Sequence, residues 1–183
     1  MKQLIYSIPL FFALTIIQSC SSNMPGKNGQ GINNDPEMPS GIDLEERLDA
    51  TEDPEQKKII ARELIDFYLK ESENKNYSLN KRAAYVFRCA ELYERQLSNY
   101  DEAFGLYVSI EKDFPESSLA PRALFMQGLL MTQHFQQLEK ANELLSKYIS
   151  TYPEHEFANM AKDILRLNFE ELGIDRDSLE ARF

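Results

Sequence analysis

Cys20 is the side chain whose position in the sequence most clearly indicates chemistry, because a thiol becomes a nucleophile when it loses its proton. It follows a short apolar run at residues 4–17, which Lys2 precedes with a positive charge. This run is shorter than the roughly 20 residues that a comfortable transmembrane helix needs. A charged start, an apolar middle and small Ser19 before the cysteine are typical of a secretory signal that is removed.

A bacterial lipobox is resembled by the three residues before Cys20, which are Ile17, Gln18 and Ser19, although glutamine is less typical at its position. The resemblance implies that residues 1–19 are cleaved off and that the Cys20 thiol carries a diacylglycerol. Ser21 follows the cysteine instead of Asp, which in lipoproteins of the enterobacterial kind indicates the outer membrane. We expect a lipid-anchored protein of the bacterial cell envelope, at the outer membrane and facing the periplasm. The alternative is an ordinary signal peptide with an incidental cysteine.

Residues 20–41 are typical of a disordered tether. The stretch after Cys20 holds four of the seven glycines and three of the eight prolines of the chain, with almost no large apolar side chain. Such a segment buries too little surface to offset the entropy lost on ordering. We therefore expect it to connect the membrane anchor flexibly to a domain that spans residues 42–183.

Composition limits the possible partners. The net charge of −10 argues against nucleic acid and against adhesion to anionic lipid, so membrane contact is expected through the lipid on Cys20 alone. Cys89 is the only other cysteine, and no intrachain disulfide is possible once Cys20 is lipidated. Core packing must then hold the domain together.

The domain is predicted to be all-α. Apolar residues recur every three or four positions, and no run alternates with period two. Helix starts and stops come from Pro54, Phe114-Pro115, Tyr152-Pro153 and Gly173. The predicted helices are 43–50, 54–72, 79–97, 100–114, 119–134, 137–151 and 155–172, with a short one at 175–182.

Two stretches of the domain match when one is shifted along the sequence by the separation between Ala90 and Gly128. We call this separation the repeat offset. The matched pairs are Ala90 with Gly128, Tyr93 with Met131, Ala103 with Ala141, Tyr107 with Leu145, and Pro115 with Pro153. Small residues at fixed positions allow two helices to approach closely at a crossing. Self-similarity at such a period predicts a helix-turn-helix repeat, with copies at about 79–115 and 117–153.

The repeats resemble tetratricopeptide repeats, although they are longer than the usual form. The resemblance implies a short α-solenoid, like that of tetratricopeptide lipoproteins in Bacteroidetes-like bacteria and, more distantly, the β-barrel assembly lipoprotein. Gly128 would next recur at Arg166, and a large cation does not fit a close crossing. Helix 155–172 is therefore predicted to cap the stack, with Leu165 and Phe169 inward and Arg166 in water. Residues 43–72 are either a degenerate repeat or an N-terminal cap.

In the resembled family, the first helix of each repeat lines a groove that binds partners. Carried over by register, this implies an apolar centre with charged edges, suited to an extended or helical peptide. The alternative is that the phenylalanines pack against their neighbours in the core. The groove residues implied are Phe87, Glu91 and Glu94, then Arg122, Phe125, Leu129 and Thr132, and finally Leu167 and Glu170.

The sequence contains no pattern that indicates catalysis, a cofactor or a metal site. His134 and His155 have no second ligand at a suitable spacing, and Cys89 lies on an apolar stripe with only Arg88 as a basic neighbour. We expect a non-enzymatic adaptor for envelope proteins. The alternatives are a glycan- or peptidoglycan-binding lipoprotein and an accessory subunit of an envelope enzyme.

Overall fold

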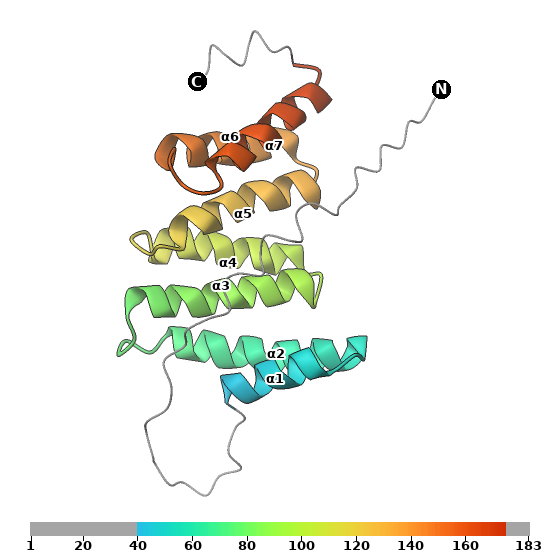
Figure 1. Ribbon diagram of the computed structural model, residues 1–183, viewed down its shortest axis with the longest axis vertical. Helices are drawn as coiled ribbons and strands as arrows, with labels where there is room; N and C mark the ends of the chain where they lie inside the picture. The colour runs from blue at the N-terminus through green and yellow to red at the C-terminus, as the bar shows by residue number, and fades with distance from the viewer. Residues whose placement is uncertain (1–39, 175–183) are drawn as a thin grey trace, which may run out of the picture. The chain divides into compact units, whose positions relative to one another are not determined.

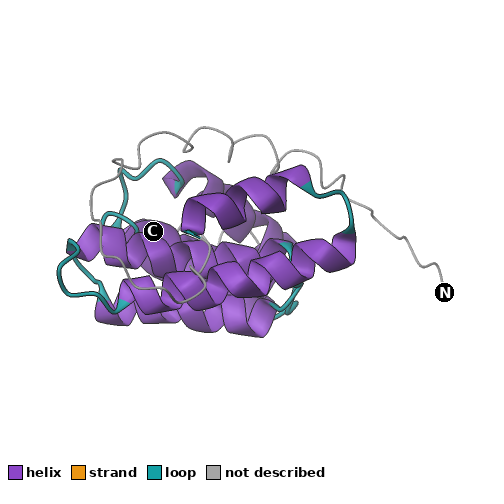
Figure 2. Cartoon of the chain, turned by 90° about the horizontal axis from the view of Figure 1, so that it is seen from below, coloured by secondary structure: helices purple, strands orange, loops and turns teal. Residues whose placement is uncertain are grey.

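The computed structural model describes residues 40–174 (Figure 1). The lipidation site at Cys20, the signal peptide, nearly all of the tether and the helix predicted at 175–182 lie outside the described residues. Within residues 40–174 every regular element is an α-helix, as Figure 2 shows. The predicted all-α class is therefore confirmed.

Seven helices make up the described part of the chain, and Figure 1 shows them stacked in chain order. Each helix packs against the one before it and the one after it, and consecutive helices make the main contacts. This is the arrangement of a short α-solenoid of helix-turn-helix repeats. The helices are α1 (Gly41–Ala50), α2 (Pro54–Ser72), α3 (Leu79–Arg95), α4 (Tyr100–Asp113), α5 (Ala120–Gln133), α6 (Leu138–Thr151) and α7 (Ala158–Glu171).

Short polar side chains begin several helices. Ser40 and Asp43 form a capping box at α1, and Asp53 accepts from the Glu55 N–H before Pro54 opens α2. Helix α1 therefore starts at Gly41, two residues earlier than predicted, so the assignment of Gly41 to the tether is wrong. Gly41 is buried, and a Cβ there would lie 2.6 Å from Cε1 of Phe67.

The same turn joins one repeat to the next. After α4, the Ser117 N–H bonds to the Phe114 carbonyl at 2.9 Å, and after α6, the His155 N–H bonds to the Tyr152 carbonyl at 3.1 Å. The turn continues for two more residues before the next helix begins, at Ala120 and at Ala158. Helix α7 therefore starts three residues later than predicted, because the residues after Pro153 form this turn.

The small residues that define the repeat lie at the helix crossings. Ala90, Ala103 and Ala141 are fully buried, and Gly128 is also buried. A Cβ on Gly128 would lie 2.8 Å from both Cγ and Cδ2 of Leu145. Helices α5 and α6 could not approach this closely with any larger residue at that position.

Helix α7 ends the described stack as the sequence predicts. Leu165 and Phe169 are buried, whereas Arg166 is partly exposed and pairs with Glu170 at 3.1 Å. Gly173 follows with a φ of +69°, and the N–H of Ile174 bonds to the Phe169 carbonyl at 3.0 Å. This is a Schellman-type helix end, which glycine adopts without strain.

The N-terminal helices continue the core of the stack. Leu44 and Leu48 of α1 pack with Leu64 of α2 and with Tyr85 and Cys89 of α3 in one hydrophobic cluster. Two further clusters follow along the chain, one around Tyr107 and Ile110 and the other around Leu145 and Leu165. The core is therefore distributed along the stack, and each pair of helices depends on its neighbours for burial.

Candidate functional site: the face of the first helices

Helices α1, α3, α5 and α7 are the first helices of successive helix pairs, and polar contacts connect each of them to the next. Glu45 of α1 meets Arg88 of α3, Glu91 of α3 meets Arg122 of α5, and Thr132 of α5 meets Asn168 of α7. We call this surface the first-helix face. It consists of Glu45, Arg88, Glu91, Glu94, Arg122, Leu129, Thr132, Leu167 and Glu170.

The pair of Glu45 and Arg88 is the best-bonded contact on the face. The two parallel hydrogen bonds, Nε to Oε1 and Nη2 to Oε2, measure 2.9 Å and 2.7 Å, and the Tyr68 hydroxyl donates to Oε1 at 2.9 Å. Burial raises the pKa of the Glu45 carboxyl, but the hydrogen bond and charge of Arg88 outweigh it and hold that pKa below its usual value. This fork geometry fixes the position of α1 against α3.

The contact between Glu91 and Arg122 is looser. Nη2 of Arg122 lies 3.8 Å from Oε1 of Glu91, and the side chains are only 19% and 16% exposed. The Arg122 guanidinium lies over the Phe87 ring, 4.9 Å from its centroid, and Nε of Arg122 has no hydrogen-bond partner among the described residues. Glu91 also pairs with Arg88 at 3.3 Å. Arg122 is thus held by the cation–π contact with Phe87 more than by its ion pair with Glu91.

Glu94 is a carboxyl group held in a poorly solvated place beside this pair. The Tyr107 hydroxyl donates to its Oε2 at 3.3 Å. Burial raises the pKa of Glu94, and the nearby Glu91 charge adds to the effect, while the Tyr107 hydrogen bond and Arg95 partly offset it. The face therefore contains two carboxyl groups, Glu45 and Glu94, whose pKa values are shifted in opposite directions.

The structure corrects the part of the predicted groove that Phe87 and Phe125 were to form. These rings are 5% and 3% exposed, so they belong to the core and offer no open apolar surface. Phe87 packs edge-to-face on Tyr107 at a centroid distance of 5.1 Å, and Phe125 stacks on Phe157 at 5.0 Å. Aromatic rings from the following helix and turn cover them.

The predicted groove residues on α5 and α7 other than Phe125 and Arg122 keep exposed surface. Leu129 and Thr132 are partly exposed, Leu167 is 48% exposed and Glu170 is exposed. The side chain of Thr132 accepts from Asn168 at 3.0 Å, and Asn168 donates to Asn142 at 2.9 Å as well. Sequence reasoning missed Asn168 and Glu45, because neither occupies a position that the repeat register assigns to the groove.

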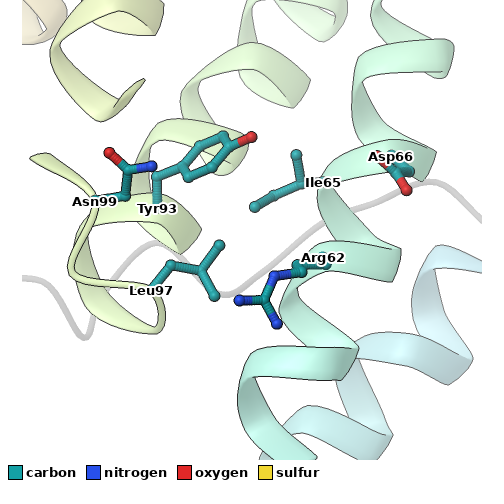
Figure 3. Close-up of a pocket in the computed structure, with 6 residues that line it drawn as sticks. All are labelled: Arg62, Ile65, Asp66, Tyr93, Leu97 and Asn99. Carbon is teal, nitrogen blue, oxygen red and sulfur yellow. The ribbon is translucent and has the colours of Figure 1, made fainter. Parts of the chain in front are cut away.

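A shallow polar cavity of about 330 Å³ lies away from this face, between α2, the end of α3 and the turn before α4 (Figure 3). Figure 3 shows Tyr93 and Leu97 opposite Ile65 and Arg62. Cys89 is buried, and burial raises the pKa of its thiol to about 12, so it stays protonated near neutral pH. No cluster of potential metal ligands occurs in the described part of the chain.

Comparison with known proteins supports the interpretation of the repeat. Residues 122–155, which cover most of α5, all of α6 and the start of the turn after it, match the family model described as the tetratricopeptide repeat. Comparisons with curated proteins and with solved structures gave no match. The chain thus contains a tetratricopeptide repeat within an α-solenoid, an architecture whose extended surfaces bind other proteins.

Proposed function

We propose that this chain is a lipid-anchored adaptor of the bacterial envelope that binds other envelope proteins through its first-helix face. The observation that carries the proposal is the recurrence of partly exposed side chains on that face at the repeat offset. Glu91, Leu129 and Leu167 form one row, and Glu94, Thr132 and Glu170 form another. A tetratricopeptide match in the middle of these rows supports a role in protein binding.

The chemistry of the rows favours a peptide or helix as the bound element. Leu129 and Leu167 are partly exposed apolar side chains on neighbouring first helices, and Thr132 and Glu170 lie one turn further along each helix. A partner segment lying across the first helices would meet an apolar anchor and a polar group at each step. Because Phe87 and Phe125 are buried, the leucines supply the apolar contact instead.

The proposed location depends on Cys20. A lipid on this residue would hold the domain at a membrane through the segment before Ser40, and we propose the outer membrane, with the domain in the periplasm. Within the described residues no helix is long and apolar enough to cross a membrane. Replacing Cys20 with Ser should abolish incorporation of a labelled fatty acid into the protein, because the variant lacks the thiol that would carry the lipid. Labelling that persists in the variant would contradict the lipid anchor.

The proposed adaptor role is tested by cross-linking in cells followed by affinity purification of the full-length, lipidated protein. The test variant is Leu129→Glu, and the matched control is Val108→Glu, since Val108 is a similarly apolar and exposed side chain on α4. We expect the parent and the control to retain an identified envelope protein that the Leu129 variant loses. Equal capture by all three would place binding elsewhere on the chain.

A further inference from the structure

The cavity of about 330 Å³ between α2 and the end of α3 combines apolar walls with a guanidinium group. Ile65 and Leu97 supply apolar walls, and Figure 3 shows the Arg62 side chain directed toward Leu97. No ion pair joins Arg62 to Asp66 among the described residues, although the two stand one helical turn apart. The Arg62 guanidinium is therefore available to an occupant of the cavity.

The place of this cavity recurs between α4 and the end of α5. Helices α2 and α4 each contain a buried series that begins with alanine and has the same spacing, and aligning them puts Arg62 where α4 has Phe104. Leu97, after α3, stands one repeat offset before Phe135, after α5. The buried series are Ala61, Ile65 and Tyr68 in α2, and Ala103, Tyr107 and Ile110 in α4.

Aromatic rings fill the equivalent place beside α4. The Phe135 ring packs edge-to-face on the Phe104 ring at a centroid distance of 6.0 Å, and the Lys140 ammonium lies 5.5 Å from the Phe104 centroid. One turn before Phe104, Tyr100 stacks on His134 at a centroid distance of 3.6 Å. The fold thus accommodates aromatic rings with a cation beside them at the place where α2 and α3 leave a cavity.

We propose that this cavity binds an aromatic side chain of a partner protein. The ring packs against Ile65 and Leu97, and the Arg62 guanidinium lies over its face in a cation–π contact. The volume of the cavity is at the lower end of the range for ligand sites, about 300–1,000 Å³. The expected tether, residues 20–39, contains no aromatic residue, so we assign the ring to another protein.

The inference rests on the proposed binding of proteins but does not depend on the first-helix face. None of the lining residues belongs to that face, and no side-chain hydrogen bond or ion pair joins the two within residues 40–174. Loss of binding at Leu129 would leave the cavity intact. A cavity that binds no ring would likewise leave the first-helix face intact, so the two proposals can fail separately.

Titration of the full-length chain, followed by nuclear magnetic resonance, tests the inference. The probes are the N-acetyl amides of phenylalanine and tyrosine, and the matched aliphatic control is the N-acetyl amide of leucine. We expect both aromatic probes to shift the amide signals of Ile65 and Leu97 in a saturable way, because a bound ring adds its ring current there. The leucine probe should cause no saturable shift at the same concentrations.

Two variants test the assigned contacts. Arg62→Gln should weaken the binding of the aromatic probes by about two- to five-fold, as expected for a cation–π contact at an exposed site. The matched control is Lys70→Gln, which removes the same charge from an exposed position of α2 and should bind like the parent. The double variant Arg62→Phe with Leu97→Phe rebuilds the aromatic pair of the equivalent place. It should lose saturable binding while its thermal midpoint stays at or above that of the parent.

The absence of a saturable shift with both aromatic probes would overturn the proposal. Equally tight binding of the leucine probe would overturn it as well, because the cavity would then not select rings. Unchanged binding in Arg62→Gln, or in the double variant, would mean that the ring binds elsewhere on the chain. Signals of Ile65 and Leu97 that shift with protein concentration, without a probe, would assign the cavity to a second copy of the chain and contradict a partner's ring.

Discussion

Arg122 of α5 approaches Glu91 of α3 to 3.8 Å but leaves its own Nε without a partner among the described residues. One step earlier, Arg88 forms two short hydrogen bonds to Glu45. The two arginines connect successive first helices in the same way, yet only one of them is well bonded. Their contributions to the free energy of unfolding should therefore differ.

Replacing Arg88 with Met should lower the free energy of unfolding by about 1–3 kcal/mol, because Glu45 would keep a partly buried charge with fewer partners. Replacing Arg122 with Met should change it by less than about 1 kcal/mol, because Met loses the cation–π contact but still packs on Phe87, and a poorly bonded charge is removed. Urea unfolding of both variants gives the comparison. A larger loss for Arg122→Met would mean that the looser pair holds the stack.

The raised pKa of Glu94 predicts how this residue affects stability as the pH changes. The folded state binds its proton more tightly than the unfolded state does, so the Glu94 contribution falls as the pH rises from the unfolded pKa, about 4.3, through the folded pKa. Glu94→Gln should therefore be more stable than the parent at pH 7, and this advantage should shrink toward pH 4. Urea midpoints measured across this range would test it. A stability advantage of Glu94→Gln over the parent that grows as the pH falls would contradict the prediction.

Two glycine substitutions should act in opposite directions. Gly128→Ala brings a Cβ to 2.8 Å from the fully buried Leu145, and we expect a loss of about 1–3 kcal/mol from overpacking. Gly105→Ala lies in α4 with no atom within 4 Å of the added Cβ, so it should gain about 0.5–1 kcal/mol. Thermal or urea unfolding of the two variants is the measurement. A stabilising Gly128→Ala would show that α5 and α6 can separate at little cost.

Phe125→Ala should reduce folding stability and partner binding together. The ring is buried against Phe157 and Tyr148, and its removal should cost about 3–5 kcal/mol. Leu129→Ser, one turn further along α5, removes a partly exposed side chain and should cost much less. Circular dichroism on heating separates the two variants. An unchanged thermal midpoint for Phe125→Ala would mean that the ring does not belong to the core and is available for binding.

Local patterns were sufficient to predict the helices and the repeat. Asp53 before Pro54, and the turns at Pro115 and Pro153, stop and start helices through neighbouring residues, so the sequence alone indicates them. The start of α7 was predicted too early, at His155. This residue lies in the turn after Pro153, where its N–H bonds to the Tyr152 carbonyl, and the sequence alone does not show that bond.

The burial of the groove phenylalanines could not be predicted in the same way. The register places Phe87 and Phe125 on the first helices correctly, but their exposure depends on rings that other segments supply, Tyr107 and Phe157. The pair of Glu45 and Arg88 joins two positions that the repeat offset does not relate. Long-range contacts of this kind depend on how the helices pack.

The most direct test of the first-helix face is a photo-cross-linking residue placed at Leu129 in one strain and at Val108 in another. Both positions are partly or well exposed, and only Leu129 lies on the face. We predict a cross-link to a distinct envelope protein from position 129, reduced by Leu167→Glu in the same chain, and none from position 108. Cross-links of equal yield from both positions, or from position 108 alone, would contradict the account.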